Sequence, residues 1–134
     1  MNNSSAPLPR VLHVDDDDDI RAIAQIALSV VGGLEVLQCS SGKEALEVAK
    51  GFDPDIFLLD VMMPDMTGEE TLTGLRLLPD LDRVPVVFMT AKAQESDVEH
   101  LMELGSEKVI AKPFDPLTLA AEVVTIWQNA RPAG

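Results

Sequence analysis

Short apolar runs alternate with longer segments of helical spacing along nearly all of the 134-residue chain, and this alternation constrains the fold more than any other feature. The runs are Val11–Val14, Leu34–Leu37, Ile56–Leu59, Val86–Met89 and Val109–Ala111. Four of them are nearly continuous, which is typical of parallel strands covered by helices on both faces. Alternating strands and helices also favour right-handed crossovers. We therefore predict a single α/β domain over residues 9–130, built on a five-stranded, doubly wound parallel sheet.

Local signals add detail to this prediction. Glu35 interrupts the run Leu34–Leu37, which predicts an edge strand. Ser41 and Thr67 each stand three residues before a glutamate, the spacing of a capping box at a helix start. Three glycines are expected to end helices in the left-handed conformation: Gly32, Gly51 and Gly105. The first helix is expected to turn one apolar stripe to the core: Ile20, Ile23, Ala24, Ala27, Leu28 and Val31.

Composition excludes several classes of protein. Asp and Glu outnumber Lys and Arg by 23 to 10, a net charge of -13 that argues against direct nucleic-acid binding and favours cations or basic protein surfaces. A single cysteine excludes an internal disulfide framework, and no apolar run is long enough to span a membrane. Residues 1–8 are interpreted as a flexible tail without a secretory signal pattern, and residues 131–134 as a C-terminal tail. We expect a cytoplasmic protein.

Chemically active side chains follow four of the five predicted strands. Asp15 to Asp19 follow the first strand, Asp60 the third, Thr90 the fourth and Lys112 the fifth. In open α/β sheets, ligands bind beyond the carboxyl ends of the strands, where the strand order reverses. The sequence therefore predicts carboxylates, a hydroxyl and a lysine gathered at one edge of the sheet.

Carboxylates crowded at that edge repel each other by roughly 4 kcal/mol per pair at about 4 Å and an effective dielectric near 20. Either one acid takes up a proton or a cation lies between them. Asp oxygens suit Mg²⁺, which typically also takes phosphate oxygens, and a carboxylate can act as nucleophile toward a phosphoryl group. For Asp17, Asp18 and Asp19 a plainer interpretation is favoured, because acids stabilise the first turn of a helix.

Four separated segments carry a resemblance to a known family. They are Val11–Asp17, Leu58–Gly68, Val86–Ala91 and Lys112–Phe114. In this order and spacing, over about residues 9–129, the chain resembles the receiver domain of two-component response regulators, of the chemotaxis-regulator type. The resemblance implies a flavodoxin-like fold with strand order 2-1-3-4-5.

The resemblance also implies a role for each site residue. Asp60 would accept a phosphoryl group, while Asp15 and Asp16 would position Mg²⁺ together with Asp60. Met62 would offer its backbone carbonyl to the metal. Thr90 would hydrogen-bond the phosphoryl group and move toward it, and Lys112 would form an ion pair with it. Such a domain is not an enzyme beyond its own phosphorylation and dephosphorylation.

Partners and coupling follow from the same resemblance. The donor would be a histidine kinase or phosphotransfer protein that docks on the first helix, where Ile26 and Val30 fall off the core stripe. These two are either contact residues or merely partly buried. The output would be an unidentified protein, reached by repacking of the surface around the last strand and its neighbouring helices. Many members carry an aromatic switch residue where this chain has Val109, so ring rotation there is excluded.

Three other classes fit less well. Haloacid-dehalogenase enzymes also use Asp, Mg²⁺, Thr and Lys, but their Asp-x-Asp-x-Thr/Val signature fails at Asp19 and would leave Asp60 idle. A helix–loop–helix calcium site counted from Asp15 needs Gly and Glu where this chain has Ile20 and Ile26. A receiver that only binds partners is disfavoured because every residue of the phosphorylation site is present.

Overall fold

The computed structural model describes residues 7–130. All of the predicted C-terminal tail, and all of the predicted N-terminal tail except Pro7 and Leu8, lie outside that range. The strands are β1 (Arg10–Val14), β2 (Glu35–Cys39), β3 (Ile56–Asp60), β4 (Val86–Thr90) and β5 (Lys108–Ala111). They form one parallel sheet in the order β2-β1-β3-β4-β5, with β2 at an edge as Glu35 predicted. The predicted fold class and strand order are confirmed.

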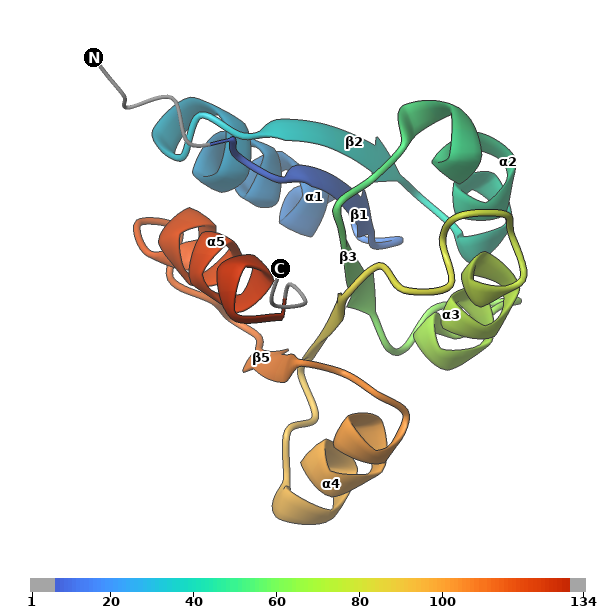
Figure 1. Ribbon diagram of the computed structural model, residues 1–134. Coiled ribbons are helices and arrows are strands. Elements are labelled where there is room, and N and C mark those ends of the chain that lie inside the picture. Colours follow the sequence, from blue (N-terminus) through green and yellow to red (C-terminus); the bar gives the residue numbers. More distant parts are fainter. Residues whose placement is uncertain (1–6, 131–134) are drawn as a thin grey trace.

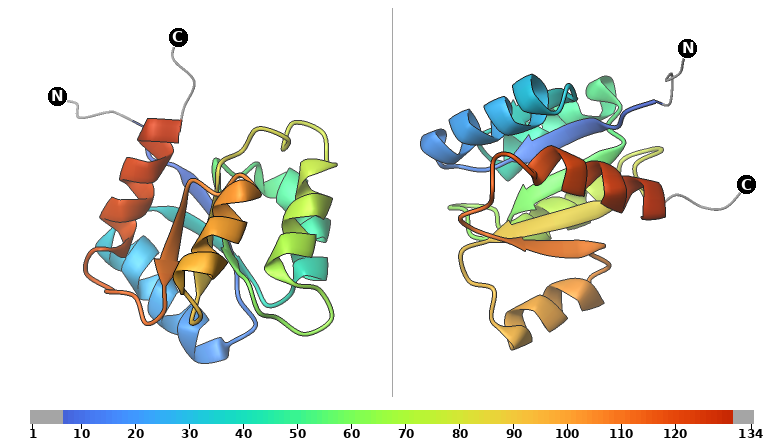
Figure 2. Two further views of the ribbon diagram at one scale, coloured as in Figure 1. Left: turned by 90° about the horizontal axis from the view of Figure 1, so that it is seen from below. Right: turned by 90° about the vertical axis from the view of Figure 1, so that its left-hand side faces the viewer.

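Helices cover both faces of this sheet (Figures 1 and 2). They are α1 (Asp18–Gln25), the π-helical segment η1 (Ile26–Val31), α2 (Gly42–Phe52), α3 (Gly68–Arg76), α4 (Glu95–Glu103) and α5 (Leu119–Ala130). The helices α1 and α5, with η1, cover one face, and α2, α3 and α4 cover the other. Among residues 7–130, none of the helices has the length and apolar character needed to cross a bilayer.

Two apolar cores result, one on each face. Alternate residues of the same strand belong to opposite cores, so that Val11 packs with α1 and α5 while Leu12 packs with α2 and α3. Strands β3 and β4 are buried over their whole length. This double burial explains why their sequences are nearly continuous apolar runs. The only polar residues at their ends, Asp60 and Thr90, are thereby held at the carboxyl edge of the sheet.

The residues buried on the first helix differ from the predicted apolar stripe. Ala24, Ala27 and Leu28 are fully buried, but Ile23 and Val31 are 44% and 51% exposed. The chain changes from α-helix to π-helix at Ile26, and π-helical hydrogen bonds span one residue more than α-helical ones. The buried face therefore departs from the regular spacing after Gln25, and an exposed apolar surface is left. We name it the η1 surface: Ile23, Ile26, Val30 and Val31.

Only one of the three glycines predicted to be left-handed has that conformation. Gly105 does, whereas α2 runs through Gly51 and ends at the left-handed Asp53. Gly32 is right-handed, and the next residue, Gly33, turns the chain. Gly32 has a different reason to lack a side chain, because a Cβ there would lie 2.2 Å from the Cβ of Ala120 on α5. Close packing of η1 on α5 requires this glycine.

The predicted helix starts at Ser41 and Thr67 are confirmed. Thr67 and Glu70 form a complete capping box, in which each side chain accepts the other residue's backbone N–H. Ser41 Oγ likewise accepts the N–H of Glu44, but the Glu44 carboxylate accepts from the N–H of Ser40 rather than from Ser41. The complete box at Thr67 holds the start of α3 in place beside Asp60.

Candidate functional site

The carboxyl ends of β1, β3 and β4 meet the chain that leaves β5 in a single cavity of about 200 Å³. Every site residue predicted from the sequence lines it: Asp15, Asp16, Asp60, Met62, Thr90 and Lys112. Asp17 and Ala91 line it as well. The topology therefore brings together residues that are up to 97 positions apart in the chain.

Lys112 joins two buried carboxylates in this cavity. Its Nζ donates to Asp15 Oδ2 at 2.7 Å and to Asp60 Oδ1 at 2.9 Å. The side chain of Asp15 is fully buried and that of Asp60 is 7% exposed. The peptide bond between Lys112 and Pro113 is cis. One ammonium thus balances part of the charge of three carboxylates, because Asp16 lies in the same cavity.

Asp15 is held by contacts that sequence reasoning did not foresee. Its N–H donates to the carbonyl of Cys39, and Oδ1 accepts the N–H of Asp17 at 2.9 Å. Arg21 Nη1 donates to the Asp15 carbonyl at 2.7 Å and also forms an ion pair with Asp18. No motif in the sequence indicated this arginine. Asp17, interpreted as a first-turn acid, caps α1 by accepting two backbone N–H groups.

Thr90 ends the buried strand β4 and is 2% exposed. Its Oγ1 accepts the N–H of Lys92 at 3.0 Å and lies 3.3 Å from the Lys92 carbonyl. The hydroxyl is therefore bound by the loop that follows its own strand, at the wall of the cavity that contains Asp60. If the Thr90 hydroxyl exchanged Lys92 for a group on Asp60, the loop that contains Lys92 would move as well.

The electrostatics of the cavity favour uptake of positive charge. Burial raises the pKa of Asp60 to about 6, with the Lys112 hydrogen bond opposing this shift and the negative charges of Asp15 and Asp16 reinforcing it. Burial alone would lower the pKa of Lys112, but its hydrogen bonds to Asp15 and Asp60 outweigh burial and the pKa is raised. The lysine therefore stays charged, and Asp60 is mainly a carboxylate at neutral pH, although its pKa lies above the ordinary aspartate value.

The same three carboxylates have the geometry of a cation site. One oxygen each of Asp15, Asp16 and Asp60 lies within 4.8 Å of the other two. Carboxylate oxygens suit hard ions such as Mg²⁺, and burial, reinforced by the negative charges of Asp15 and Asp16, raises the pKa of Asp60. Met62, whose carbonyl was predicted as a further ligand, lines this cavity, and the residue is 69% exposed. The residues present fit a divalent cation.

The connection from β3 to α3 approaches Asp60 very closely. Gly68, the first residue of α3, donates its N–H to the Val61 carbonyl at 2.9 Å. A Cβ on Gly68 would lie 2.1 Å from the Asp60 carbonyl oxygen. Only glycine fits at this position, so Gly68 decides how near the start of α3 comes to the backbone of Asp60.

His13 lies beneath the site, fully buried on β1. Gln38 Nε2 donates to His13 Nδ1 at 3.0 Å and to the Arg21 carbonyl at 2.8 Å. Burial, with the positive charges of Lys112 and Arg21 nearby, lowers the pKa of His13 to about 3. His13 is therefore a packed neutral histidine, in agreement with its position in the middle of a predicted strand.

This histidine should make the fold sensitive to acid. Between pH 6.5 and about 3 the unfolded chain binds a proton at His13 that the native chain does not, so stability is lost as pH falls. Between pH 6.5 and pH 4 the loss relative to His13→Val is expected to reach about 3 kcal/mol. Urea unfolding of both proteins at several pH values measures it, and a constant difference between them would contradict the prediction.

Comparison with known proteins places the chain in a family. The sequence model of the response regulator receiver domain matches residues 11–124. The transcriptional regulatory protein CseB of Streptomyces coelicolor is 36% identical over 124 residues, which cover 92% of this chain and 51% of that protein. The alkaline phosphatase synthesis transcriptional regulatory protein PhoP of Bacillus subtilis is 35% identical over 121 residues, which cover 90% and 49%. The chain thus spans about half the length of these curated relatives.

Solved structures agree with this result. The Vibrio cholerae chemotaxis protein CheY4 superposes with a TM-score of 0.82 at 29% identity, over 90% of this chain and 99% of that one. The chain belongs to the response regulator receiver domain family of two-component systems. Members of this family are signalling domains rather than enzymes in the ordinary sense.

Proposed function

We propose that this domain accepts a phosphoryl group on Asp60 from a histidine kinase or a histidine phosphotransfer protein. One observation carries the proposal: Lys112 Nζ joins Asp60 and Asp15 in a cavity that also contains Asp16 and Thr90. A carboxylate nucleophile, a fixed cation and a hydroxyl are the groups that phosphoryl transfer to a protein needs.

The transfer forms one bond and breaks another. An oxygen of the Asp60 carboxylate attacks phosphorus, a P–O bond forms, and the P–N bond to the donor imidazole breaks. Lys112 leaves Asp60 Oδ1 for the oxygens of the new phosphoryl group, at a small displacement because it is already held by Asp15. Thr90 then donates its hydroxyl to the phosphoryl group and gives up its contacts with Lys92.

A divalent cation completes this assignment. Asp15, Asp16, Asp60 and the Met62 carbonyl would hold Mg²⁺, which supplies positive charge to neutralise the phosphoryl oxygens. Asp15 is already oriented by Asp17 and Lys112, so binding would require little rearrangement of that residue.

The direct test is intact mass spectrometry after incubation with Mg²⁺ and acetyl phosphate. We expect a gain of one phosphoryl group that requires Mg²⁺ and is absent in Asp60→Asn. A gain that survives in Asp60→Asn would move the acceptor to the aspartates after β1. Absence of any gain, from acetyl phosphate and from phosphoramidate alike, would contradict the proposal.

Met62 is expected to lengthen the life of the aspartyl phosphate. Its exposed thioether at the cavity wall offers an attacking water no strong hydrogen-bond partner. Met62→Asn introduces an amide that can orient that water, so we expect faster dephosphorylation by roughly tenfold, less than the roughly 10²–10⁴-fold that a positioned general acid or base contributes. The decay of phosphorylated protein, followed by mass, gives the rate. An unchanged half-life of the aspartyl phosphate in Met62→Asn would contradict this prediction.

The η1 surface suits the docking of the phosphodonor. The side chains of Ile26 and Val30 are 55% and 76% exposed, far more than partial burial would leave. Contiguous exposed apolar side chains on one helix mark contact surfaces, and this helix begins beside the site at Asp18. We propose that the donor docks here, and that the output is an unidentified protein and not nucleic acid. A cytoplasmic location stays a prediction.

A further inference from the structure

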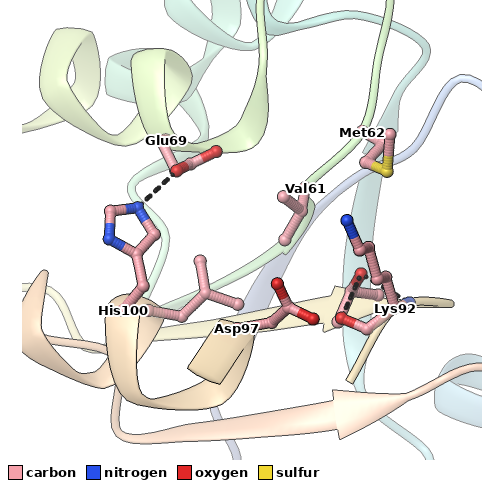
Figure 3. Close-up of a pocket in the computed structure, with 8 residues that line it drawn as sticks. Val61, Met62, Glu69, Lys92, Asp97 and His100 are labelled. Carbon is pink, nitrogen blue, oxygen red and sulfur yellow. Dashed lines mark hydrogen bonds and ion pairs between the residues drawn. The ribbon is translucent and has the colours of Figure 1, made fainter. Parts of the chain in front are cut away.

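A second cavity, of about 190 Å³, lies between α3 and α4 (Figure 3). We name it the α3–α4 pocket. Its walls include the apolar side chains of Val61 and Leu101, and its polar groups include Asp97, Glu69 and His100. None of these residues belongs to the phosphorylation site predicted from the sequence.

Asp97 is the unmatched charge of this pocket. Its Oδ2 atom is buried, and no described residue donates a hydrogen bond to it. Figure 3 shows the carboxylate pointing toward the space between Val61 and Lys92. A buried carboxylate oxygen without a donor is unfavourable, so the site gains by receiving one.

The neighbouring charges leave Asp97 available. His100 Nε2 is 2.8 Å from Glu69 Oε2, and this contact ties α4 to α3. The ammonium end of Lys92 points toward Met62 rather than toward Asp97 (Figure 3), and no ion pair between Lys92 and Asp97 occurs among the described residues. The pocket therefore offers one carboxylate oxygen without a described hydrogen-bond donor, beside the apolar side chains of Val61 and Leu101.

We propose that the α3–α4 pocket receives an arginine side chain of the protein to which this domain signals. The proposal rests on the proposed function. Val61 and Leu101 suit the methylene stem of arginine, and Asp97 suits the guanidinium. Guanidinium is more weakly hydrated than ammonium and is the cation favoured in buried ion pairs. The chain's charge of -13 also attracts a partner with a basic surface.

The pocket is joined to the phosphorylation site by a common wall. Met62 and Thr90 line both cavities. If Thr90 moves toward a phosphoryl group on Asp60, its contacts with Lys92 break and the wall of the α3–α4 pocket recedes. Arginine then binds more tightly to the phosphorylated domain, and by reciprocity arginine favours the phosphorylated state.

The test uses the full chain labelled with ¹⁵N and two probes, acetyl-arginine amide and acetyl-citrulline amide. Citrulline has the same length but carries a neutral urea in place of guanidinium. In the unphosphorylated protein we expect arginine to shift the amide signals of Val61, Asp97 and Leu101, with citrulline binding about tenfold more weakly, equivalent to about 1.4 kcal/mol. Equal affinities, or shifts confined to other residues, would overturn the proposal.

Two variants locate the effect. Asp97→Asn should abolish the preference for arginine over citrulline. Glu103→Gln, which removes an exposed carboxylate from the same helix outside the pocket, should keep it. If both variants lose the preference, attraction by the general negative charge of α4 replaces the assigned contact.

A final comparison tests the coupling. The titration is repeated on protein whose phosphorylation has been verified by mass, and tighter arginine binding is expected; an unchanged affinity would refute the coupling. If no phosphorylation can be achieved, the proposed function fails. The comparison of arginine with citrulline on the unphosphorylated chain still decides whether the pocket binds arginine.

Discussion

Asp60→Asn is expected to have a larger free energy of unfolding than the unsubstituted protein at pH 7.5, and to lose phosphorylation altogether. Burial, opposed by Lys112 and reinforced by Asp15 and Asp16, raises the pKa of Asp60 from 3.8 to about 6. A raised carboxyl pKa means that the native chain binds a proton more tightly than the unfolded chain, so this group's contribution to stability falls as pH rises from 3.8 to 6. Above pH 6 the cost of holding the Asp60 carboxylate in this buried site is fully present. Asparagine carries no charge and removes about 2 to 3 kcal/mol of that cost.

Chemical denaturation in chelator-treated buffer measures this gain. Asp65→Asn is the matched control, because Asp65 is exposed and left-handed, a conformation that asparagine tolerates. It should change stability by less than about 0.5 kcal/mol. Mg²⁺ should reduce the stability advantage of Asp60→Asn. A ligand that binds only the folded state stabilises the protein with all three carboxylates more than the variant that lacks one of them. Equal stabilities of Asp60→Asn and the native chain without metal would refute the electrostatic argument.

Gly68→Ala is expected to destabilise the fold by about 3 kcal/mol and to slow phosphorylation of Asp60. The new methyl would lie 2.1 Å from the Asp60 carbonyl oxygen and 3.0 Å from its carbonyl carbon. The obstacle is backbone on a fully buried strand, which cannot rotate away as a side chain would. Either the start of α3 moves outward or Asp60 is displaced, and both separate the acceptor from its neighbours.

Gly51→Ala provides the opposite control. Gly51 lies inside α2, and a Cβ there would meet nothing within 4 Å. Alanine is favoured over glycine by about 0.5–1 kcal/mol in a helix interior, and Gly51 lies in the last turn of α2, so this variant should be more stable by at most that amount and phosphorylate normally. Urea unfolding and the rate of the mass gain give both readouts. Destabilisation of the two variants by similar amounts would show that the contact at Gly68 does not decide the effect.

The fold and most of the site could be predicted from the sequence because both depend on periodicity. Buried parallel strands need apolar runs, and the first polar residue after each run marks the edge of the sheet where Asp60 and Thr90 lie. The same logic placed Lys112 after the last strand. Periodicity failed where the backbone departs from a regular repeat, as in η1, where π-helical hydrogen bonds leave Val31 exposed although its spacing predicts burial.

The glycines show a second limit. Gly51 and Gly32 were expected to end helices in the left-handed conformation. A left-handed aspartate, Asp53, ends α2 instead of Gly51, while Gly32 does follow η1 directly but is right-handed and makes room for Ala120. A glycine required by a neighbour in space has no signature in its own stretch of sequence. Gly68 is similar, since its neighbour is the Asp60 backbone.

The sequence by itself determined the order of the elements, the burial of the central strands and the residue types at the sheet edge, because each of these follows from local spacing. Only the tertiary structure decided which atoms meet: the two carboxylates that share Lys112, the arginine on the Asp15 carbonyl, and the buried Oδ2 of Asp97 on α4, for which no described residue is a donor. Lys112 joins residues distant in the chain, and the energies of all three features depend on distances and burial that arise only when the helices have packed onto the sheet.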